Sequence, residues 1–191
     1  MNRYVLASIR MALVTLVLVG IVYPLAMTGL AQLAMPAQAN GSLLVESGTV
    51  VGSALIGQRF TEAKYFHGRP SAAGASGYDA IASGASNLAP TSKTLVDRVK
   101  AAVASETADN PGLVFGNVPV DMVTASGSGL DPDITLANAY AQVARVAVAR
   151  GLTAAHVRGI VDSVAQGRQF GVLGEPRVNV LRLNLVLDAT K

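Results

Sequence analysis

The strongest constraint on this chain is an uncharged apolar segment near its N-terminus. From Met11 to Met35 the sequence reads MALVTLVLVGIVYPLAMTGLAQLAM and contains no charged side chain. A run of about 20 apolar residues is long enough to cross the hydrocarbon layer of a membrane as a helix. Pro24 and Gly29 would weaken a helix in water but are tolerated in lipid. We therefore expect residues 11–35 to form a transmembrane helix between a short N-terminal segment, residues 1–10, and one domain, residues 36–191.

A cleaved signal peptide is the alternative interpretation, because Ala37-Gln38-Ala39 has the small–x–small pattern of a cleavage site. The apolar run is longer than the usual signal-peptide core of about 7–15 residues, which favours a retained anchor. Arg3 and Arg10 precede the run, and the next basic residue is Arg59. Since positive residues stay on the cytoplasmic side, we expect a single-pass protein with its N-terminus in the cytoplasm and its main domain outside.

The composition of residues 36–191 excludes several kinds of site. Two of the 15 basic residues lie before the apolar run, which leaves 13 basic and 12 acidic residues after it. A nearly neutral domain lacks the basic patch of a protein that binds nucleic acid. The chain has no cysteine, so disulfides and thiolate metal sites are excluded. Its length is enough for a single core that is held together by packing alone.

Sequence patterns after the apolar run predict an α+β domain with about three helices packed on a small sheet. Apolar spacing and capping residues indicate the helices, and alternation or β-rich composition indicates the strands. The expected helices cover 92–106, 131–150 and 153–166, with Gly151 and Gly167 as terminators, and the expected extended segments are 43–45, 49–51, 118–123 and 178–185.

Residues 68–90, GRPSAAGASGYDAIASGASNLAP, have no periodic pattern and are rich in Gly, Ser, Ala and Pro. Such a composition is typical of a flexible linker. Tyr78, Ile81 and Leu88 are apolar residues that a solvated linker would not need. We therefore favour an ordered, irregular loop that packs on the domain.

The stretch DMVTASGSGLDPDIT, residues 121–135, is open to four interpretations: a phosphate-binding turn, a nucleophile turn, a cation site or the entry to a helix. Gly127 and Gly129 permit the positive φ of a tight turn. Asp131 is suited to cap a helix, with Pro132 in its first position. The acidic residues would repel a phosphate, and a calcium loop needs more oxygen donors over a longer segment. We favour the structural turn.

Catalytic motifs are absent from the sequence. It contains no Gly-x-x-x-x-Gly-Lys-Ser/Thr phosphate loop and no Gly-x-Ser-x-Gly nucleophile elbow. His67 and His156 are its only histidines, and neither has a metal-ligand partner at helical spacing. We interpret both as ordinary surface or capping residues and predict no catalytic and no metal site.

Several blocks, in this order after a single N-terminal span, closely resemble the C subunit of the bacterial Kdp-type potassium-transporting ATPase. The resemblance covers nearly the whole chain. The blocks are YFHGRPSA (65–72), SGASNLAPT (83–91), VDMVTASGSGLDP (120–132), RVA (145–147), ARG (149–151) and GEPRVNVL (174–181).

The resemblance implies an accessory subunit of a high-affinity potassium uptake pump in the inner membrane, with its main domain in the periplasm. In that family a channel-like subunit carries potassium, and a P-type subunit hydrolyses ATP through a phosphorylated aspartate. The C subunit is held to be needed for assembly and to act as a catalytic chaperone that raises the ATP affinity of the P-type subunit. This chain has neither a Thr-Val-Gly-Tyr-Gly potassium filter nor an Asp-Lys-Thr-Gly motif, which agrees with a non-catalytic role.

Two expectations about contacts follow. A chaperone for ATP binding would face the cytoplasm, whereas the flanking charges place this domain outside, so we expect any effect on ATP affinity to pass through the membrane helix or through assembly. The loops 68–90 and 124–131 are the candidate docking surfaces for the partner subunits.

A membrane-anchored periplasmic hydrolase and a ligand-binding domain are the alternatives to the subunit function. The candidate interface or turn residues are Arg69, Ser86, Asn87, Ser126, Gly127, Ser128, Gly129 and Asp131.

Overall fold

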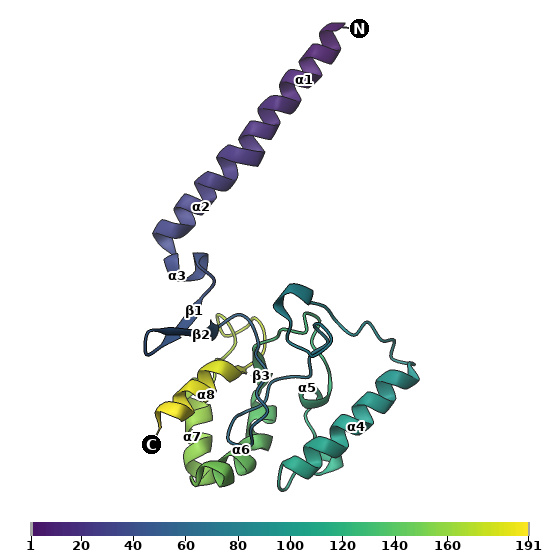
Figure 1. Ribbon diagram of the computed structural model, residues 1–191, viewed down its shortest axis with the longest axis vertical. Helices are drawn as coiled ribbons and strands as arrows, with labels where there is room; N and C mark the ends of the chain where they lie inside the picture. The colour runs from purple at the N-terminus through teal and green to yellow at the C-terminus, as the bar shows by residue number, and fades with distance from the viewer. Residues whose placement is uncertain (1, 191) are drawn as a thin grey trace. The chain divides into compact units, whose positions relative to one another are not determined.

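The N-terminal apolar segment folds as one long helix in the computed structural model, which describes residues 2–190 (Figure 1). The helix consists of α1 (Asn2–Val17), a π-helical turn η1 (Leu18–Val22) and α2 (Tyr23–Ala34). An 18-residue window within residues 3–34 has a mean hydropathy of 2.5, and 32 residues at 1.5 Å each span about 48 Å. The expected helix is confirmed, although it begins at Asn2 and not at Met11. It is long and apolar enough to cross a membrane.

The π-helical turn η1 ends two residues before Pro24. Pro24 has no N–H with which to bond the carbonyl of Gly20, and its ring needs room in the preceding turn. A π turn widens the helix locally and provides that room. The Thr28 hydroxyl donates a hydrogen bond to the Pro24 carbonyl at 2.8 Å, as serine and threonine side chains commonly do in such helices.

A short helix, α3 (Pro36–Ala39), and a hairpin follow the long helix. The hairpin pairs β1 (Leu43–Glu46) with β2 (Thr49–Ser53), which confirms the two strand fragments expected there. Ser47 and Gly48 form its two-residue loop, and both have positive φ, 49° and 80°. Such a loop matches the right-handed twist of paired strands.

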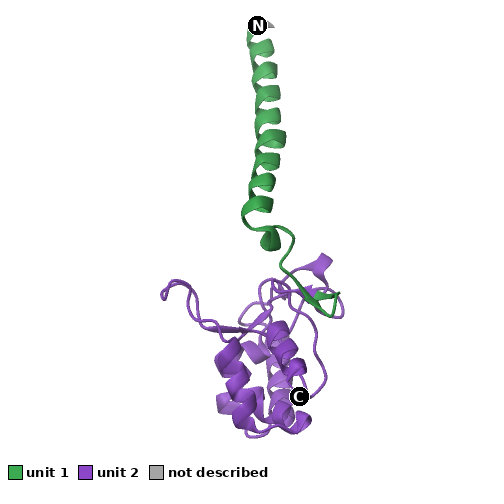
Figure 2. Ribbon diagram, turned by 90° about the vertical axis from the view of Figure 1, so that its left-hand side faces the viewer, with its two compact units in different colours: residues 1–51 green, residues 52–191 purple. Residues whose placement is uncertain are grey.

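The chain divides into two units, one ending at Val51 and one starting at Gly52, coloured separately in Figure 2. The second unit is called the outer domain below, after the location that the sequence predicts for it. It contains α4 (Lys93–Asp109), α5 (Val120–Val123), α6 (Leu136–Arg150), α7 (Ala154–Val164) and α8 (Val180–Ala189). It also contains the short 3-10 helices η2 (Ala80–Ala82) and η3 (Phe115–Asn117), and the strands β3 (Asp133–Thr135) and β4 (Arg177–Asn179). The predicted α+β class is confirmed.

The core of the outer domain lies between α6, α7, α8 and the β3–β4 pair. The strands are antiparallel, with Ile134 opposite Val178. The buried core residues are Phe66, Ile134, Ala139, Val143, Val146, Ala147, Val157, Ile160, Val161, Val178, Val180, Leu183 and Leu187. Helices α6 and α7 have the caps that the sequence predicts at Gly151, which is left-handed with φ 66°, and at Thr153, whose side chain accepts from the His156 N–H. Helix α7 ends at Val164, before the expected stop at Gly167.

The predicted C-terminal strand, residues 178–185, is wrong beyond its first residues. The structure has β4 up to Asn179 and then helix α8. The Asn179 side chain accepts a hydrogen bond from the Arg182 N–H and so caps the helix. Val180, Leu183 and Leu187 are all buried, which is the spacing of one helix face. The alternation of leucines masked that pattern.

The predicted extended segment at 118–123 is also wrong, because most of it forms the single helical turn α5. Helix α4 is confirmed at residues 93–109, although no residue along it is fully buried. The loop at 68–90 is ordered and packed in part. Ala73 is fully buried and Tyr78 is half-buried, whereas Ile81 is exposed.

Candidate functional site

The two candidate loops, 68–90 and 124–131, lie against each other and are joined by hydrogen bonds. The Ser71 hydroxyl donates to the Gly129 carbonyl at 2.6 Å. The Ser128 carbonyl accepts from the Gly84 N–H at 2.9 Å and from the Ser83 hydroxyl at 3.0 Å. Segments about 50 residues apart in the chain thus form one surface, here called the joined-loop surface, defined as residues 68–90 together with 124–131.

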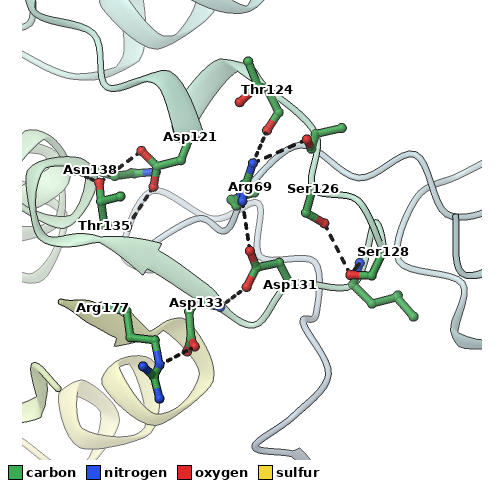
Figure 3. Close-up of polar contacts among 12 residues, drawn as sticks. Arg69, Asp121, Thr124, Ser126, Ser128, Asp131, Asp133, Thr135, Asn138 and Arg177 are labelled. Atoms are coloured by element: carbon green, nitrogen blue, oxygen red, sulfur yellow. Dashed lines mark hydrogen bonds and ion pairs between the residues drawn. The ribbon is translucent and has the colours of Figure 1, made fainter. Parts of the chain in front are cut away.

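Arg69 connects the same two loops through its charge (Figure 3). Its Nη1 lies 3.0 Å from a carboxylate oxygen of Asp131. Its Nη2 lies 3.5 Å from the Thr124 carbonyl and 3.4 Å from the Ala125 carbonyl. Both partners of the ion pair are about one-quarter exposed, so the pair is shielded from solvent more than a surface salt bridge.

Asp131 does not cap a helix, contrary to the prediction. Its second carboxylate oxygen accepts from the Asp133 N–H at 3.0 Å, which makes a local turn of the Asx type. Residues 133–135 then pair with β4 as strand β3, and helix α6 begins only at Leu136 with Thr135 as its cap. The structure therefore has a strand where the sequence predicted the first turn of a helix.

Gly129 is the residue that the close approach of the loops requires. Its φ is 67°, and a Cβ there would lie 2.7 Å from the Gly84 carbonyl oxygen and 2.8 Å from the Ala73 nitrogen. Both contacts are with backbone, which cannot swing aside. Gly127 differs, because a Cβ there meets nothing within 4 Å and its φ is not positive. The predicted positive φ is confirmed for Gly129 and wrong for Gly127.

The two serines of this segment have structural contacts. The Ser128 hydroxyl accepts from the Leu130 N–H at 3.1 Å and lies 3.5 Å from the hydroxyl of Ser126, which is buried. The exposed part of the joined-loop surface includes Asn87, Gly127 and Ser128. Ser86 is half-buried and lines a groove of about 550 Å³ between these loops and α4. The eight candidate residues therefore come from one region of the outer domain.

Asp121 is a buried acidic residue that the sequence interpretation missed. Its carboxylate accepts from the Thr135 N–H at 2.8 Å, the Thr135 hydroxyl at 3.0 Å and the Asn138 amide at 3.1 Å (Figure 3). It thereby fixes the start of α6 from the turn α5. The sequence did carry a signal for this residue, because Asp121 is the single acidic residue within the apolar sequence VPVDMV. A charge amid apolar residues is buried only with partners, so this pattern indicates a buried carboxylate with hydrogen-bond donors around it.

A second missed feature holds residues 63–67 against the helices. The polar clasp, defined here as Gln142, Arg145, Arg150 and Asn184, binds the backbone of this irregular segment. Asn184 accepts from the Phe66 N–H at 2.9 Å and donates to the Phe66 carbonyl at 3.0 Å. Gln142 does the same for His67 at 2.7 and 3.1 Å. Each amide side chain replaces the strand that would otherwise pair with this backbone.

The two arginines complete the polar clasp. Buried Arg145 donates to the carbonyls of Ala63 and Tyr65 at 2.8 and 2.9 Å and to the Asn110 side chain at 3.0 Å. Arg150 donates to the Lys64 carbonyl at 2.7 Å. Burial lowers the pKa of Arg145, although a guanidinium remains charged at neutral pH. The carbonyl dipoles of Ala63 and Tyr65 stabilise the buried positive charge of Arg145.

His67 is half-buried, so its interpretation as a surface residue is wrong. Its ring Nε2 lies 3.2 Å from the Glu62 carbonyl and 3.5 Å from Arg145. Burial, and then the positive charge of Arg145, lower the pKa of His67. His156 is exposed on α7, as expected. Within residues 2–190 no cluster of three or more His, Asp or Glu side chains forms a metal site.

Comparison with known proteins gives a consistent family. The sequence profile described as KdpC, the c chain of K+-transporting ATPase, matches residues 5–189. A potassium-transporting ATPase KdpC subunit of Gemmatimonas aurantiaca is 59% identical over 189 residues, covering 99% of this chain and 94% of the relative. KdpC subunits of Rhodopseudomonas palustris and Koribacter versatilis are 56% and 52% identical, over 97% and 100% of this chain and 98% and 97% of the relatives.

Proposed function

This chain belongs to the KdpC family, the c chains of K+-transporting ATPases, and we propose that it is a non-catalytic subunit needed to assemble the pump. Its partners are a channel-like subunit that carries potassium and a P-type subunit that hydrolyses ATP. The joined-loop surface is the docking surface. The observation that carries the proposal is that loops distant in sequence are fixed together with Asn87, Gly127 and Ser128 left exposed.

The contacts of the polar side chains favour this proposal over a hydrolase. The hydroxyls of Ser126 and Ser128 contact each other and a backbone N–H, and a serine nucleophile needs a general base instead. The His67 ring contacts a carbonyl and a guanidinium. A histidine beside a fixed positive charge is a poor base, because protonation would place two cations together.

The proposed topology is a single pass through the inner membrane, with the N-terminus in the cytoplasm and the outer domain in the periplasm. Arg3 and Arg10 lie at the N-terminal end of the apolar helix, where the positive-inside rule places the cytoplasm. In this arrangement the outer domain does not reach ATP in the cytoplasm. A raised ATP affinity of the pump is therefore transmitted through the membrane helix or through assembly.

Two exposed glycines provide a matched test of the docking surface. A Cβ at Gly127, on the joined-loop surface, or at Gly159, on α7, meets nothing within 4 Å. We expect Gly127→Arg to reduce co-purification of the partner subunits and growth at limiting potassium, and Gly159→Arg to leave both unchanged. Equal melting temperatures would show that both variants fold.

The outcomes separate the parts of the proposal. Full assembly of the Gly127→Arg pump would refute the docking surface. Purification of the tagged wild-type chain without any partner would refute the assembly role. ATP binding by the isolated full chain with micromolar affinity in calorimetry would contradict the indirect route to ATP affinity.

A further inference from the structure

A β-hairpin arm extends between α7 and β4, in the yellow-green part of the chain in Figure 1. Gln166 and Arg177 exchange backbone hydrogen bonds of 2.8 and 2.9 Å at its base, and Gln169 and Leu173 exchange bonds of 2.8 and 2.9 Å near its tip. Arg168 donates two bonds of 2.8 Å to the Glu175 carboxylate across the arm. The arm, defined as residues 166–177, is thus an ordered element.

The tip of the arm presents three apolar side chains to solvent. Phe170 is 86% exposed, Val172 is 72% exposed and Leu173 is 57% exposed. Phe170 has a φ of 54° and Gly171 a φ of 77°, so the backbone turns tightly at the tip and the apolar side chains are not folded back. Apolar residues concentrated on an ordered protrusion indicate a contact with another apolar phase.

The base of the arm lies close to residues 52–54, the entry edge, where the chain enters the outer domain. The Ala54 carbonyl accepts from the Asn179 side chain at 2.9 Å, and Asn179 lies two residues beyond the base of the arm. A Cβ on Gly52 would lie 2.8 Å from the Leu181 side chain, so the entering segment also packs against the start of α8. Residues 35–51 tie this edge covalently to the end of the apolar helix.

We propose that the tip of the arm inserts into the lipid headgroup region of the membrane that holds the anchor. The proposal rests on the proposed membrane anchoring, which keeps the entry edge near a bilayer. Side chains such as Phe and Leu at an interface bury to a depth of about 5–10 Å. The Arg168 side chain pairs with Glu175 and is 46% exposed beside the apolar tip, so lipid phosphates can compete with this exposed carboxylate for it. The arm gives the outer domain a second membrane contact and limits its rotation about the anchor.

The absence of cysteine in the chain allows a direct test with single labels. Val172→Cys in the full-length protein would carry an environment-sensitive fluorophore in vesicles of phosphatidylcholine and phosphatidylglycerol. Nitroxide-labelled lipids report contact with the bilayer, and iodide reports contact with water. Val148→Cys on α6, 80% exposed in the wild type, is the solvent control. Leu16→Cys in the apolar helix is the membrane control.

We expect lipid nitroxides to quench labels at 172 and 16 and to leave the label at 148 unquenched, with iodide giving the reverse order. Quenching at 16 but not at 172 would overturn the arm proposal and leave the anchor intact. No quenching at 16 would overturn the anchoring and the arm proposal with it. The assembled pump gives one further outcome. A label at 172 that is shielded from both quenchers there would show that the tip contacts a protein partner, which also overturns the lipid proposal.

Discussion

Removal of the Asn184 side chain should strongly destabilise the outer domain. Asn184 is 1% exposed and its amide satisfies both backbone groups of Phe66, which is 0% exposed. In Asn184→Ala two buried backbone groups lose their partner at about 1–3 kcal/mol each, which gives a loss of about 2–6 kcal/mol. The higher helix propensity of alanine offsets at most about 0.7 kcal/mol of this loss. The total stability of a domain is only about 5–15 kcal/mol, so the loss is a large part of it.

The measurement is thermal and urea unfolding of the full-length protein in detergent, followed by circular dichroism. For a domain of this size about 1 kcal/mol lowers the melting temperature by roughly 3–4 °C, so we expect a decrease of roughly 6–24 °C. Asn117→Ala is the control, because Asn117 is exposed at the end of η3 and the same side chain is removed there without stranding a buried backbone group. A loss below about 1 kcal/mol relative to that control would refute the role of the polar clasp.

Three further predictions concern Gly129, Asp131 and His67. Gly129→Ala should lower the free energy of unfolding by roughly 1–3 kcal/mol, because alanine is strained at positive φ and its Cβ would overlap with backbone atoms. Gly127→Ala should change it by less than about 0.5 kcal/mol. Equal unfolding midpoints for the two variants would contradict the need for glycine at position 129. Asp131→Ala should lower the free energy of unfolding by about 1–2 kcal/mol, because it removes the ion pair with Arg69 and the hydrogen bond from the Asp133 N–H. Asp131→Asn keeps an acceptor for that N–H and should lower it less. A larger loss for Asp131→Asn than for Asp131→Ala in urea unfolding would be inconsistent with an Asx turn. The folded pKa of His67 lies below its ordinary value of 6.5, so the unfolded chain takes up the proton first, and stability that is present above pH 6.5 is lost as the pH falls through the folded pKa. His67→Gln should remove this part of the pH dependence. The same pH profile of the unfolding free energy in the variant and the wild type would contradict the role of His67.

Local signals in the sequence predicted the elements whose stability is local. The αL stop at Gly151 and the cap at Thr153 depend on residues within about one turn, and the long helix depends on one continuous apolar run. All three features are confirmed. The error at residues 178–185 arose because a leucine every second residue fits a strand as well as a helix over one short element. The capping contact of Asn179 and the burial of Val180, Leu183 and Leu187 decide for the helix.

The contacts across the joined-loop surface depend on long-range pairing that no periodicity records. Asp131 has the residue type and the following proline of a helix cap, yet its carboxylate pairs with Arg69, 62 residues earlier. The partners of Asp121, Gln142 and Asn184 are likewise set by tertiary structure. The sequence placed the candidate residues in two loops, and only the fold joins them into one surface.

The π-helical turn at Leu18–Val22 shifts the phase of the long apolar helix. An extra residue in one turn advances the side chains beyond it by about 100° relative to an unbroken α-helix. The stripe of side chains along α1 therefore does not continue along α2, and the two halves present different directions. A substitution scan of this helix needs two separate helical wheels, one on each side of the turn. Two different neighbours can therefore bind this one helix, one against α1 and the other against α2.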